Sequence, residues 1–128
     1  DHCRRRGIYM STGFLISPAL DDVGYIESLP RRLAESGIQV PEFITFETAF
    51  PGTPYFNRAA RGETAPFLPG VNLRDLNGYM LTQRPAQASP ADYVAAYRAT
   101  LQKVYSRRNK MIKLAADTCL VKKIWYAS

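Results

Sequence analysis

The chain has 128 residues, a net charge of +6 and a hydrophobic fraction of 46%, which are ordinary values for one folded domain with its own core. No apolar run approaches the roughly 20 residues that a membrane-spanning helix needs, and no apolar segment follows the basic first residues as it would in a secretory signal. We therefore expect a cytoplasmic protein without a membrane span. Because the first residue is Asp1, we also expect a piece of a longer polypeptide.

The positive charge lies in the second half of the chain. Residues 1–64 have a net charge of −1, whereas residues 65–128 have a net charge of +7. A basic surface of this kind can bind nucleic acid or an anionic ligand, but it can equally be the solvated face of a helix. No nucleic-acid recognition motif accompanies the charge, so we expect no specific nucleic-acid partner.

The first elements are a helix end and a strand. Arg4, Arg5 and Arg6 suit the negative end of a helix dipole, and Gly7 is a typical residue just after a helix. The apolar run 8–17 (IYMSTGFLIS) then predicts a strand. Its apolar residues do not alternate cleanly, which is typical of a strand covered on both faces.

A helix is predicted next, because apolar residues recur at three- and four-residue spacing. These residues are Val23, Ile26, Leu29 and Leu33. Either Asp21 or Asp22 can cap this helix, and Gly37 can end it. Pro30 interrupts the pattern, so either the helix kinks there or a new helix begins with Pro30 in its first turn.

A second buried strand is predicted within residues 38–50, with its best part from Phe43 to Phe50. Strand, helix and strand joined by short loops form a βαβ unit, whose strands should be parallel and whose crossover should be right-handed. The Pro-Gly-Thr-Pro corner at 51–54 ends the strand, and Gly52 should adopt a backbone conformation that is costly for other residues. Pro54 should lie in the first turn of a short helix that closes at Gly62.

The remainder divides into a loop-rich connection and a helical extension. Residues 63–88 are rich in proline and glycine, with one short extended piece predicted at 78–85. Ser89, Pro90 and Asp92 then give a strong helix start, a variant of the capping box. Tyrosines at four-residue spacing follow, and helix is predicted to about residue 125, with a possible break near 106–109. The predicted divisions are therefore 1–62, 63–88 and 89–128.

The candidate site residues lie at the ends of the two strands, because ligands of parallel sheets bind beyond the carboxyl ends of the strands. Ser17 ends the first strand, and Glu47 and Thr48 lie near the end of the second. A carboxylate in an apolar strand needs a partner or a polar cavity. Glu47 is thus either a ligand contact at a barrel mouth or one half of a structural hydrogen bond or ion pair.

Other chemistry-bearing residues give no convincing site. Cys3 and Cys119 lie near opposite ends of the chain, and His2 is the only histidine, so neither a zinc site nor a nucleophilic triad is predicted. The pair Asp21 and Asp22 could bind a metal, but helix capping is the simpler role. The tyrosines of the last helix could stack on nucleic-acid bases, but their helical spacing favours a place in the core.

The order of these segments resembles the C-terminal part of radical S-adenosylmethionine proteins, especially the cobalamin-binding group. The stretches that carry the resemblance are GFLIS, FETAFPGTPYF and SPADYVAAYRATL, and the similarity covers roughly residues 4–107. In that family a late barrel strand reads Gly-Phe-Ile, and the next strand runs into a Pro-Gly-Thr-Pro corner followed by a Tyr or Phe helix. The chain departs from the family in having Ser17 where a glycine follows the earlier strand, and it lacks the Cys-x3-Cys-x2-Cys cluster motif.

The resemblance implies an α/β fold, namely the C-terminal βαβ portion of a partial (β/α) TIM-like barrel, followed by a mainly helical extension. It implies that the parent is a radical enzyme using S-adenosylmethionine, a [4Fe–4S] cluster and possibly cobalamin, and that the cluster ligands lie outside this chain. By resemblance, the segment from Phe14 to Pro18 faces the cofactor, with Phe14, Ile16 and Ser17 as candidate contacts beside Glu47 and Thr48.

Two alternative functions are therefore considered. In the first, the chain supplies barrel wall and part of the substrate and cofactor mouth of such an enzyme, its partner is the rest of the parent polypeptide, and alone it is inactive. In the second, it is a free-standing basic helical module that binds nucleic acid or a partner protein. Unpaired strand edges favour the first, because a self-contained domain must cover the edges of its sheet.

Overall fold

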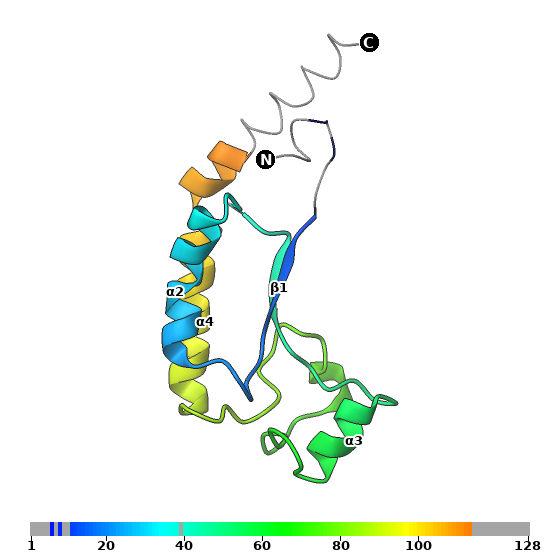
Figure 1. The fold of residues 1–128 in the computed structure, drawn as a ribbon. Coiled ribbons are helices and arrows are strands. Elements are labelled where there is room, and N and C mark those ends of the chain that lie inside the picture. The colour runs from blue at the N-terminus through cyan, green and yellow to red at the C-terminus, as the bar shows by residue number, and fades with distance from the viewer. Residues whose placement is uncertain (1–5, 7, 9–10, 39, 114–128) are drawn as a thin grey trace.

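A computed structural model of the chain describes residues 6, 8, 11–38 and 40–113 (Figure 1). These residues form an α/β structure with a two-stranded parallel sheet and several helices. The predicted helix end at residues 1–6 lies, except for Arg6, outside the described residues, as does the predicted helix beyond residue 113. Within the described part of the chain, no helix has the length and apolar character required to cross a membrane.

The sheet consists of β1 (Gly13–Ile16) and β2 (Phe43–Phe46), paired in parallel so that Gly13 lies beside Phe43 and Ile16 beside Phe46. The predicted βαβ unit and its parallel strands are therefore confirmed. Both strands are shorter than the predicted runs 8–17 and 38–50, because the strands lie side by side only over four residues.

Helix α2 (Val23–Glu35) connects the two strands. Asp22 caps its first turn, since its carboxylate accepts a hydrogen bond of 2.6 Å from the Tyr25 N–H. Pro30 lies inside this single helix, so no second helix begins there. Gly37 closes the element with a φ of +73°, a value that glycine adopts without steric cost.

The Pro-Gly-Thr-Pro corner has the predicted geometry. Gly52 has a φ of +86°, and Pro54 begins α3 (Pro54–Ala60). Thr53 is the N-cap, because its Oγ1 accepts a hydrogen bond of 3.1 Å from the Phe56 N–H. The hydroxyl also donates to the Phe50 carbonyl at 2.7 Å. One threonine thus connects the end of the strand segment to the start of the helix.

Residues 61–89 form the connection between α3 and the last described helices. The connection contains one 3₁₀ turn, η1 (Leu73–Asp75), and one antiparallel bridge between Phe67 and Gln83. The short extended piece predicted at 78–85 is reduced to that bridge. The segment is held by its ends and by a few hydrogen bonds, such as the 2.9 Å bond from Leu68 N–H to the Thr82 carbonyl.

Helix α4 (Pro90–Val104) begins at the predicted cap. The Ser89 hydroxyl accepts a hydrogen bond of 3.1 Å from the Asp92 N–H and donates to the Asp92 carboxylate at 2.7 Å. The helix ends at Val104, and helical structure resumes at residues 107–113. This interruption agrees with the break predicted near 106–109.

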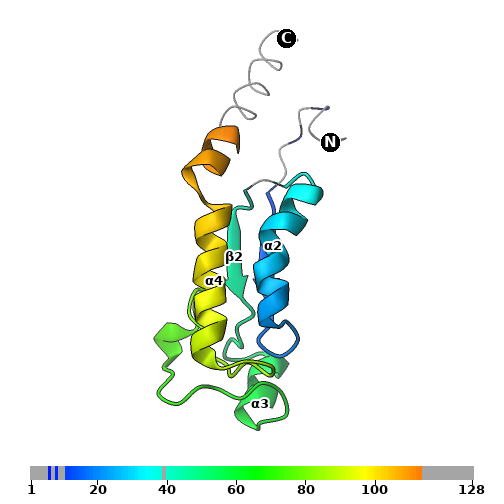
Figure 2. The same ribbon diagram turned by 90° about the vertical axis from the view of Figure 1, so that its left-hand side faces the viewer.

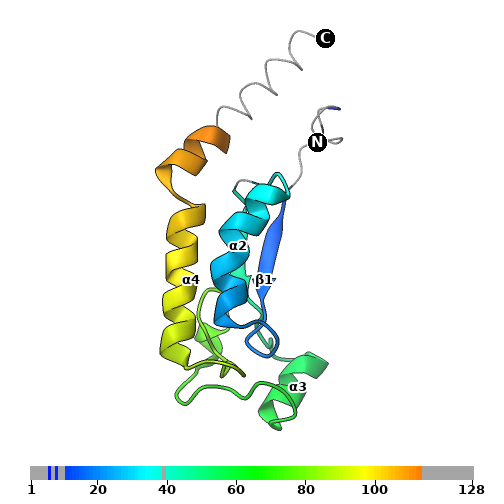
Figure 3. The ribbon, with the colours of Figure 1, turned by 60° about the vertical axis from the view of Figure 1, so that its left-hand side comes forward.

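The helices α2 and α4 lie side by side on the same face of the sheet (Figure 2). Their buried side chains form one core with those of the strands, in which Phe46 packs on Tyr97 with a ring-centroid distance of 4.3 Å. The Thr100 hydroxyl, which is buried, donates to the Ile26 carbonyl at 2.9 Å and so joins the two helices. Figure 3 shows the resulting two layers, with α3 and its loops beyond the end of the sheet.

Candidate functional site

Side chains of the two strands alternate between a helical face and an open face. On the helical face, Ile16 is 0% exposed and Ile44 and Phe46 are buried against α2 and α4. On the open face, Leu15 is 65% exposed and Phe43 is 42% exposed. The expectation that the first strand is covered on both faces is therefore not met within the described residues, because both packed helices lie on one face.

The outer edge of β2 is closed by three different groups. The Tyr97 hydroxyl donates to the Ile44 carbonyl at 2.7 Å. The Phe46 N–H donates to the Gly78 carbonyl at 2.7 Å, and the Phe46 carbonyl accepts a hydrogen bond of 3.1 Å from Thr48 Oγ1. A further strand could pair with this edge only by displacing these bonds.

The outer edge of β1 is open. In the two-stranded sheet this strand has β2 on one side, and among the described residues no hydrogen bond reaches its other side from another segment. An unpaired strand edge presents a row of backbone N–H and C=O groups that can pair with another strand. The sheet can therefore be extended beside β1 and not beside β2.

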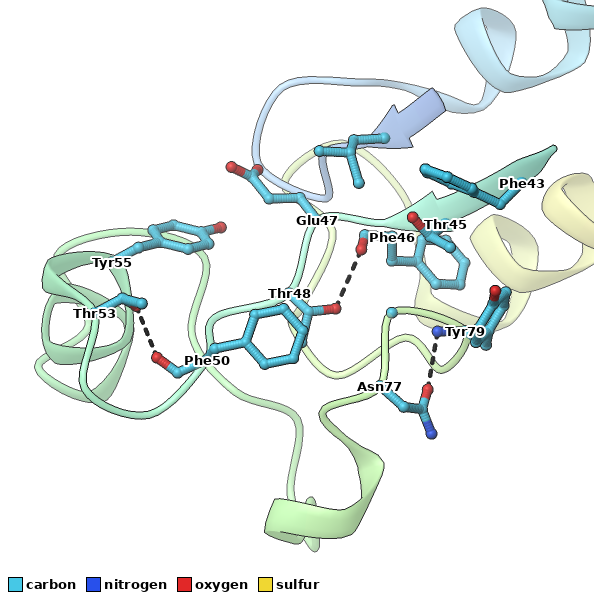
Figure 4. A pocket seen from close by; sticks show the side chains of 12 residues that line it. Phe43, Thr45, Phe46, Glu47, Thr48, Phe50, Thr53, Tyr55, Asn77 and Tyr79 are labelled. Atoms are coloured by element: carbon cyan, nitrogen blue, oxygen red, sulfur yellow. Dashed lines mark hydrogen bonds between the residues drawn. The ribbon is translucent and has the colours of Figure 1, made fainter. Parts of the chain in front are cut away.

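A hollow of about 430 Å³ lies on the open face, at the carboxyl ends of the strands (Figure 4). Strand side chains Leu15, Thr45 and Glu47 form part of its wall. The corner and α3 add Phe50 and Tyr55, and the loop before α4 adds a further wall at residues 77–79. The hollow thus lies where ligands of parallel α/β folds bind.

Ser17 and Glu47 meet at the end of the sheet. The Ser17 hydroxyl donates a hydrogen bond to Oε2 of Glu47, and the Ser17 N–H donates to the Asp21 carboxylate at 2.7 Å. The Ser17 carbonyl accepts a hydrogen bond of 3.1 Å from the Tyr93 hydroxyl. Strand, loop and helix α4 therefore all fix the backbone that presents the Ser17 hydroxyl to Glu47.

Tyr55 connects the hollow to a buried glutamine. Its hydroxyl donates to Oε1 of Gln83 at 3.2 Å, and Nε2 of the fully buried Gln83 donates to the Ala65 carbonyl at 2.8 Å. Burial raises the pKa of the Tyr55 phenol, and the nearby Glu47 carboxylate raises it further. The phenol is therefore a neutral hydrogen-bonding group beside the carboxylate at neutral pH.

The residues predicted from the sequence divide between the two faces of the sheet. Ser17 and Glu47 are brought together at the hollow, and Thr48 lines it while its hydroxyl bonds to the Phe46 carbonyl. Phe14 and Ile16 instead direct their side chains into the core formed with α2 and α4. Ile16 is fully buried and offers only its backbone for a ligand contact, whereas Phe14 is half-buried and packs on the face opposite to the hollow.

Several residues of the hollow were not predicted. Tyr55 belongs to the segment after the corner, and the Asn77-Gly78-Tyr79 turn comes from the long loop. The Asn77 side chain accepts from the Tyr79 N–H at 2.9 Å and so shapes the turn. The Asn-Gly pair is a turn signal in the sequence, but nothing in the sequence indicates that the turn folds back against β2.

The fit of the implied cofactors differs from one group to the next. At the end of β1, the Ser17 hydroxyl and the strand backbone offer hydrogen-bonding groups of the kind that the adenosine of S-adenosylmethionine would need. A [4Fe–4S] cluster needs cysteine thiolates. Within the described residues no group of three or more His, Cys, Asp or Glu side chains could hold a metal ion, and Cys3 and Cys119 lie outside them.

The tyrosines of α4 are core residues. Tyr93 and Tyr97 are buried against Phe46, and their hydroxyls bond to backbone carbonyls of the strand segments. Burial raises the pKa of Tyr97 to about 12, with smaller contributions from Tyr105 and Tyr79. Neither ring is available as a platform for nucleic-acid bases.

Comparisons with known proteins do not identify a family for this chain. Models of protein families, curated proteins and solved structures were all searched, and none of them matches the chain.

Proposed function

We propose that this chain is the C-terminal wall of a larger (β/α) barrel of the radical S-adenosylmethionine type, with cobalamin as a further cofactor of the parent enzyme. The observation that carries the proposal is the asymmetry of the sheet. Helices cover one face, whereas Leu15 and Phe43 are exposed on the other, where only Thr45 is buried, beside Gly78. The outer edge of β2 is hydrogen-bonded, whereas the outer edge of β1 has no strand partner among the described residues. A partial, open (β/α) barrel would have this combination in its last strand pair, with helices outside, an inner face turned toward the ligand and a partner strand on one side only.

The order of the strands agrees with this proposal. In a parallel barrel, successive strands of the chain lie next to one another, so earlier strands belong beside β1. That is the edge to which no described segment bonds. The later strand, β2, carries the edge that Tyr97, Gly78 and Thr48 close.

The residues of this chain would bind and orient ligands at the barrel mouth. The Ser17 hydroxyl would accept a hydrogen bond from the polar part of the adenosine, while the backbone of Phe14 and Ile16 would form the wall behind it, and Glu47 would face the substrate. S-Adenosylmethionine, together with the cluster, would supply the one-electron chemistry. The cluster thiolates would come from the preceding part of the polypeptide.

The proposal is tested with the polypeptide encoded by the complete reading frame and with the 128-residue chain in parallel. After anaerobic reconstitution, we expect the complete protein to bind iron and sulfide and to cleave S-adenosylmethionine reductively. The 128-residue chain should bind neither in stoichiometric amounts. A complete reading frame that lacks a three-cysteine motif, or a complete protein that binds no cluster, would rule out the proposed enzyme class.

Hydrogen exchange tests the architecture independently of the cofactors. In the 128-residue chain, the amides of Gly13 and Leu15 should exchange quickly and the amide of Phe46 slowly, because only the latter is bonded at an outer edge. In the complete protein, all three should be protected. Fast exchange at Gly13 and Leu15 in both proteins would show that no strand pairs with β1.

A further inference from the structure

The Glu47 carboxylate lies at the edge of the hollow. One of its oxygens accepts from the Ser17 hydroxyl, and among the described residues it forms no ion pair. In Figure 4 the Glu47 and Tyr55 side chains lie on the same side of the hollow. A partly buried negative charge is stabilised by a cation or by several hydrogen bonds. Glu47 therefore has capacity for a positively charged hydrogen-bond donor.

The rest of the hollow is largely aromatic. Phe43, Phe50 and Tyr79 are 42%, 50% and 63% exposed, although large aromatic side chains gain free energy when they are buried. The faces of aromatic rings carry negative electrostatic potential and attract organic cations. A volume of about 430 Å³ is within the range of small-molecule sites. Carboxylate and rings thus favour the same kind of ligand.

We propose that this hollow binds a small organic cation, an ammonium or amidinium group on an apolar or aromatic body, with the charged group on Glu47 and the body against Phe50. The inference rests on the proposed function for the place of the hollow at a barrel mouth, and it names the substrate class of that site. Ser17 is a positioning residue in this arrangement, because its hydroxyl orients the carboxylate.

One described cation lies close to the site. The Arg58 guanidinium is 6.0 Å from the centroid of the Tyr55 ring. Arg58 is exposed and does not line the hollow. Water screens its repulsion for a bound cation, since two charges near a surface interact weakly at high dielectric. Arg58 consequently has little effect on the affinity of the hollow for a cation.

The test uses the 128-residue chain and two probes of similar shape, phenethylammonium and the neutral 2-phenylethanol. Binding is measured by calorimetry and by the NMR shifts of the methyl groups of Leu15 and Thr45. We expect saturable binding of phenethylammonium that is about tenfold tighter than that of the alcohol, because a hydrogen bond to a charged group is stronger than a neutral one.

Two glutamate variants separate a specific effect from a general change of charge. Glu47→Gln should weaken phenethylammonium about tenfold and leave 2-phenylethanol unchanged. Glu27→Gln removes an equal charge from the exposed side of α2, in the other layer of the molecule, and should change neither affinity. Circular dichroism should confirm that both variants remain folded.

A third variant keeps the proposal testable if Glu47→Gln unfolds the chain. Ser17→Ala leaves the carboxylate in place and removes its orienting hydrogen bond. We expect this variant to weaken phenethylammonium by a factor of about three, again without an effect on the alcohol. Equal affinities for the two probes in the unaltered chain, or equal losses in the Glu47 and Glu27 variants, would overturn the inference.

The outcomes also distinguish this inference from the proposed enzyme class. Cluster binding and cofactor cleavage by the complete protein, combined with no preference for the amine, would sustain the enzyme and reject the cationic substrate. Amine binding by the chain, combined with a complete protein that holds no cluster, would do the reverse. Tight binding of neutral adenosine without amine binding would show that Glu47 recognises a ribose instead.

Discussion

The two faces of the sheet differ in how far their side chains are buried. On the helical face, Ile44 and Phe46 are buried, Phe14 is half-buried, and Ile16 has no exposed surface. On the open face, Leu15 on the same strand keeps 65% of its surface exposed. Adjacent residues of one strand thus have opposite surroundings, although the sequence places apolar side chains at both positions.

This difference indicates where the free energy of folding and the capacity for binding are located. Apolar burial contributes about 25 cal/mol for each Å² that is removed from water, so the helical face supplies the stability of the chain. The apolar side chains of the open face would contribute a similar free energy only when a ligand or another segment covers them. Substitutions on the two faces should therefore change different measurements.

The largest expected effect is a loss of stability on the helical face. Ile16→Ala should lower the free energy of unfolding by about 2–5 kcal/mol, because it leaves a cavity among buried side chains. Leu15→Ala should change it by less than about 0.5 kcal/mol, because the side chain is mainly exposed. Urea denaturation followed by circular dichroism measures both.

A milder substitution serves as the control for this pair. If Ile16→Ala does not fold, Ile16→Val should still cost about 0.5–1.5 kcal/mol. Comparable losses at Leu15 and Ile16 would mean that the open face is covered in solution. The contrast between the faces would then be wrong for the chain by itself.

The second effect concerns the sealed edge of β2. Gly78→Ala should destabilise the fold by about 1–3 kcal/mol, because φ is +82° and because this turn is held against β2 by the 2.7 Å hydrogen bond from the Phe46 N–H to the Gly78 carbonyl. Gly52→Ala should cost only about 1 kcal/mol, since its φ of +86° is equally unusual but nothing lies within 4 Å of the added atom. The two variants differ because the backbone at Gly52 is free of close neighbours, whereas the backbone at Gly78 is held against β2. The midpoints of thermal denaturation measure the difference.

A larger loss of stability for Gly52→Ala than for Gly78→Ala would show that the corner at 51–54 is the more rigid of the two turns. A Gly78 variant with unchanged stability would show that the Asn77-Gly78 turn is not held against β2 in solution. The edge would then be open on both sides of the sheet, and the order of strands in the proposed barrel would lose its support.

A smaller effect is expected at Tyr97, which joins α4 to the edge of β2. Tyr97→Phe should cost about 1 kcal/mol, because the Ile44 carbonyl loses its 2.7 Å hydrogen bond. The variant should also change the response to alkaline pH. The pKa of Tyr97 is about 12 in the folded chain against an ordinary value of 10.0.

The sign of the pH effect follows from the direction of that shift. Between pH 10 and 12 the unfolded chain has lost the phenolic proton that the folded chain retains. The stability contributed by this group is therefore complete below pH 10 and is lost as the pH rises toward 12. Urea midpoints from pH 9 to 11.5 should fall less steeply for Tyr97→Phe than for the unaltered chain. Identical slopes would show that Tyr97 is not protected by burial.

Local features of this fold could be predicted from the sequence. Asp22, Thr53 and Ser89 are followed by helices whose first turns they cap, and Gly37 and Gly52 have the positive φ expected of them. These features depend on a few neighbouring residues. The spacing of apolar residues likewise predicted which face of α2 is buried, because a helix repeats every 3.6 residues.

Features that depend on distant contacts could not be predicted. The apolar run that contains Phe14, Leu15 and Ile16 does not show which side the helices cover, because all three residues are apolar. Phe14 and Ile16 were therefore candidates for ligand contact although they face the core. Gly78 and Tyr55 reach the site through loops, and no periodicity in the sequence fixes where a loop folds back.

The smallest expected effect concerns the basic side of the helical layer, and it decides which face is functional. Arg107 and Lys110 are exposed in the helical stretch 107–113. If this surface bound nucleic acid specifically, affinity would be high and would fall steeply with salt, because each neutralised phosphate releases counter-ions. We expect only binding weaker than about micromolar at physiological salt, the range of general electrostatic attraction.

Fluorescence anisotropy with labelled DNA and RNA across a salt series measures this affinity. Arg107→Glu with Lys110→Glu should abolish this weak binding and change the free energy of unfolding by less than about 0.5 kcal/mol, since exposed charges contribute little to stability. Nanomolar, sequence-dependent binding that the double variant removes would transfer the function from the open face to the helical layer, and the chain would then be a nucleic-acid-binding module.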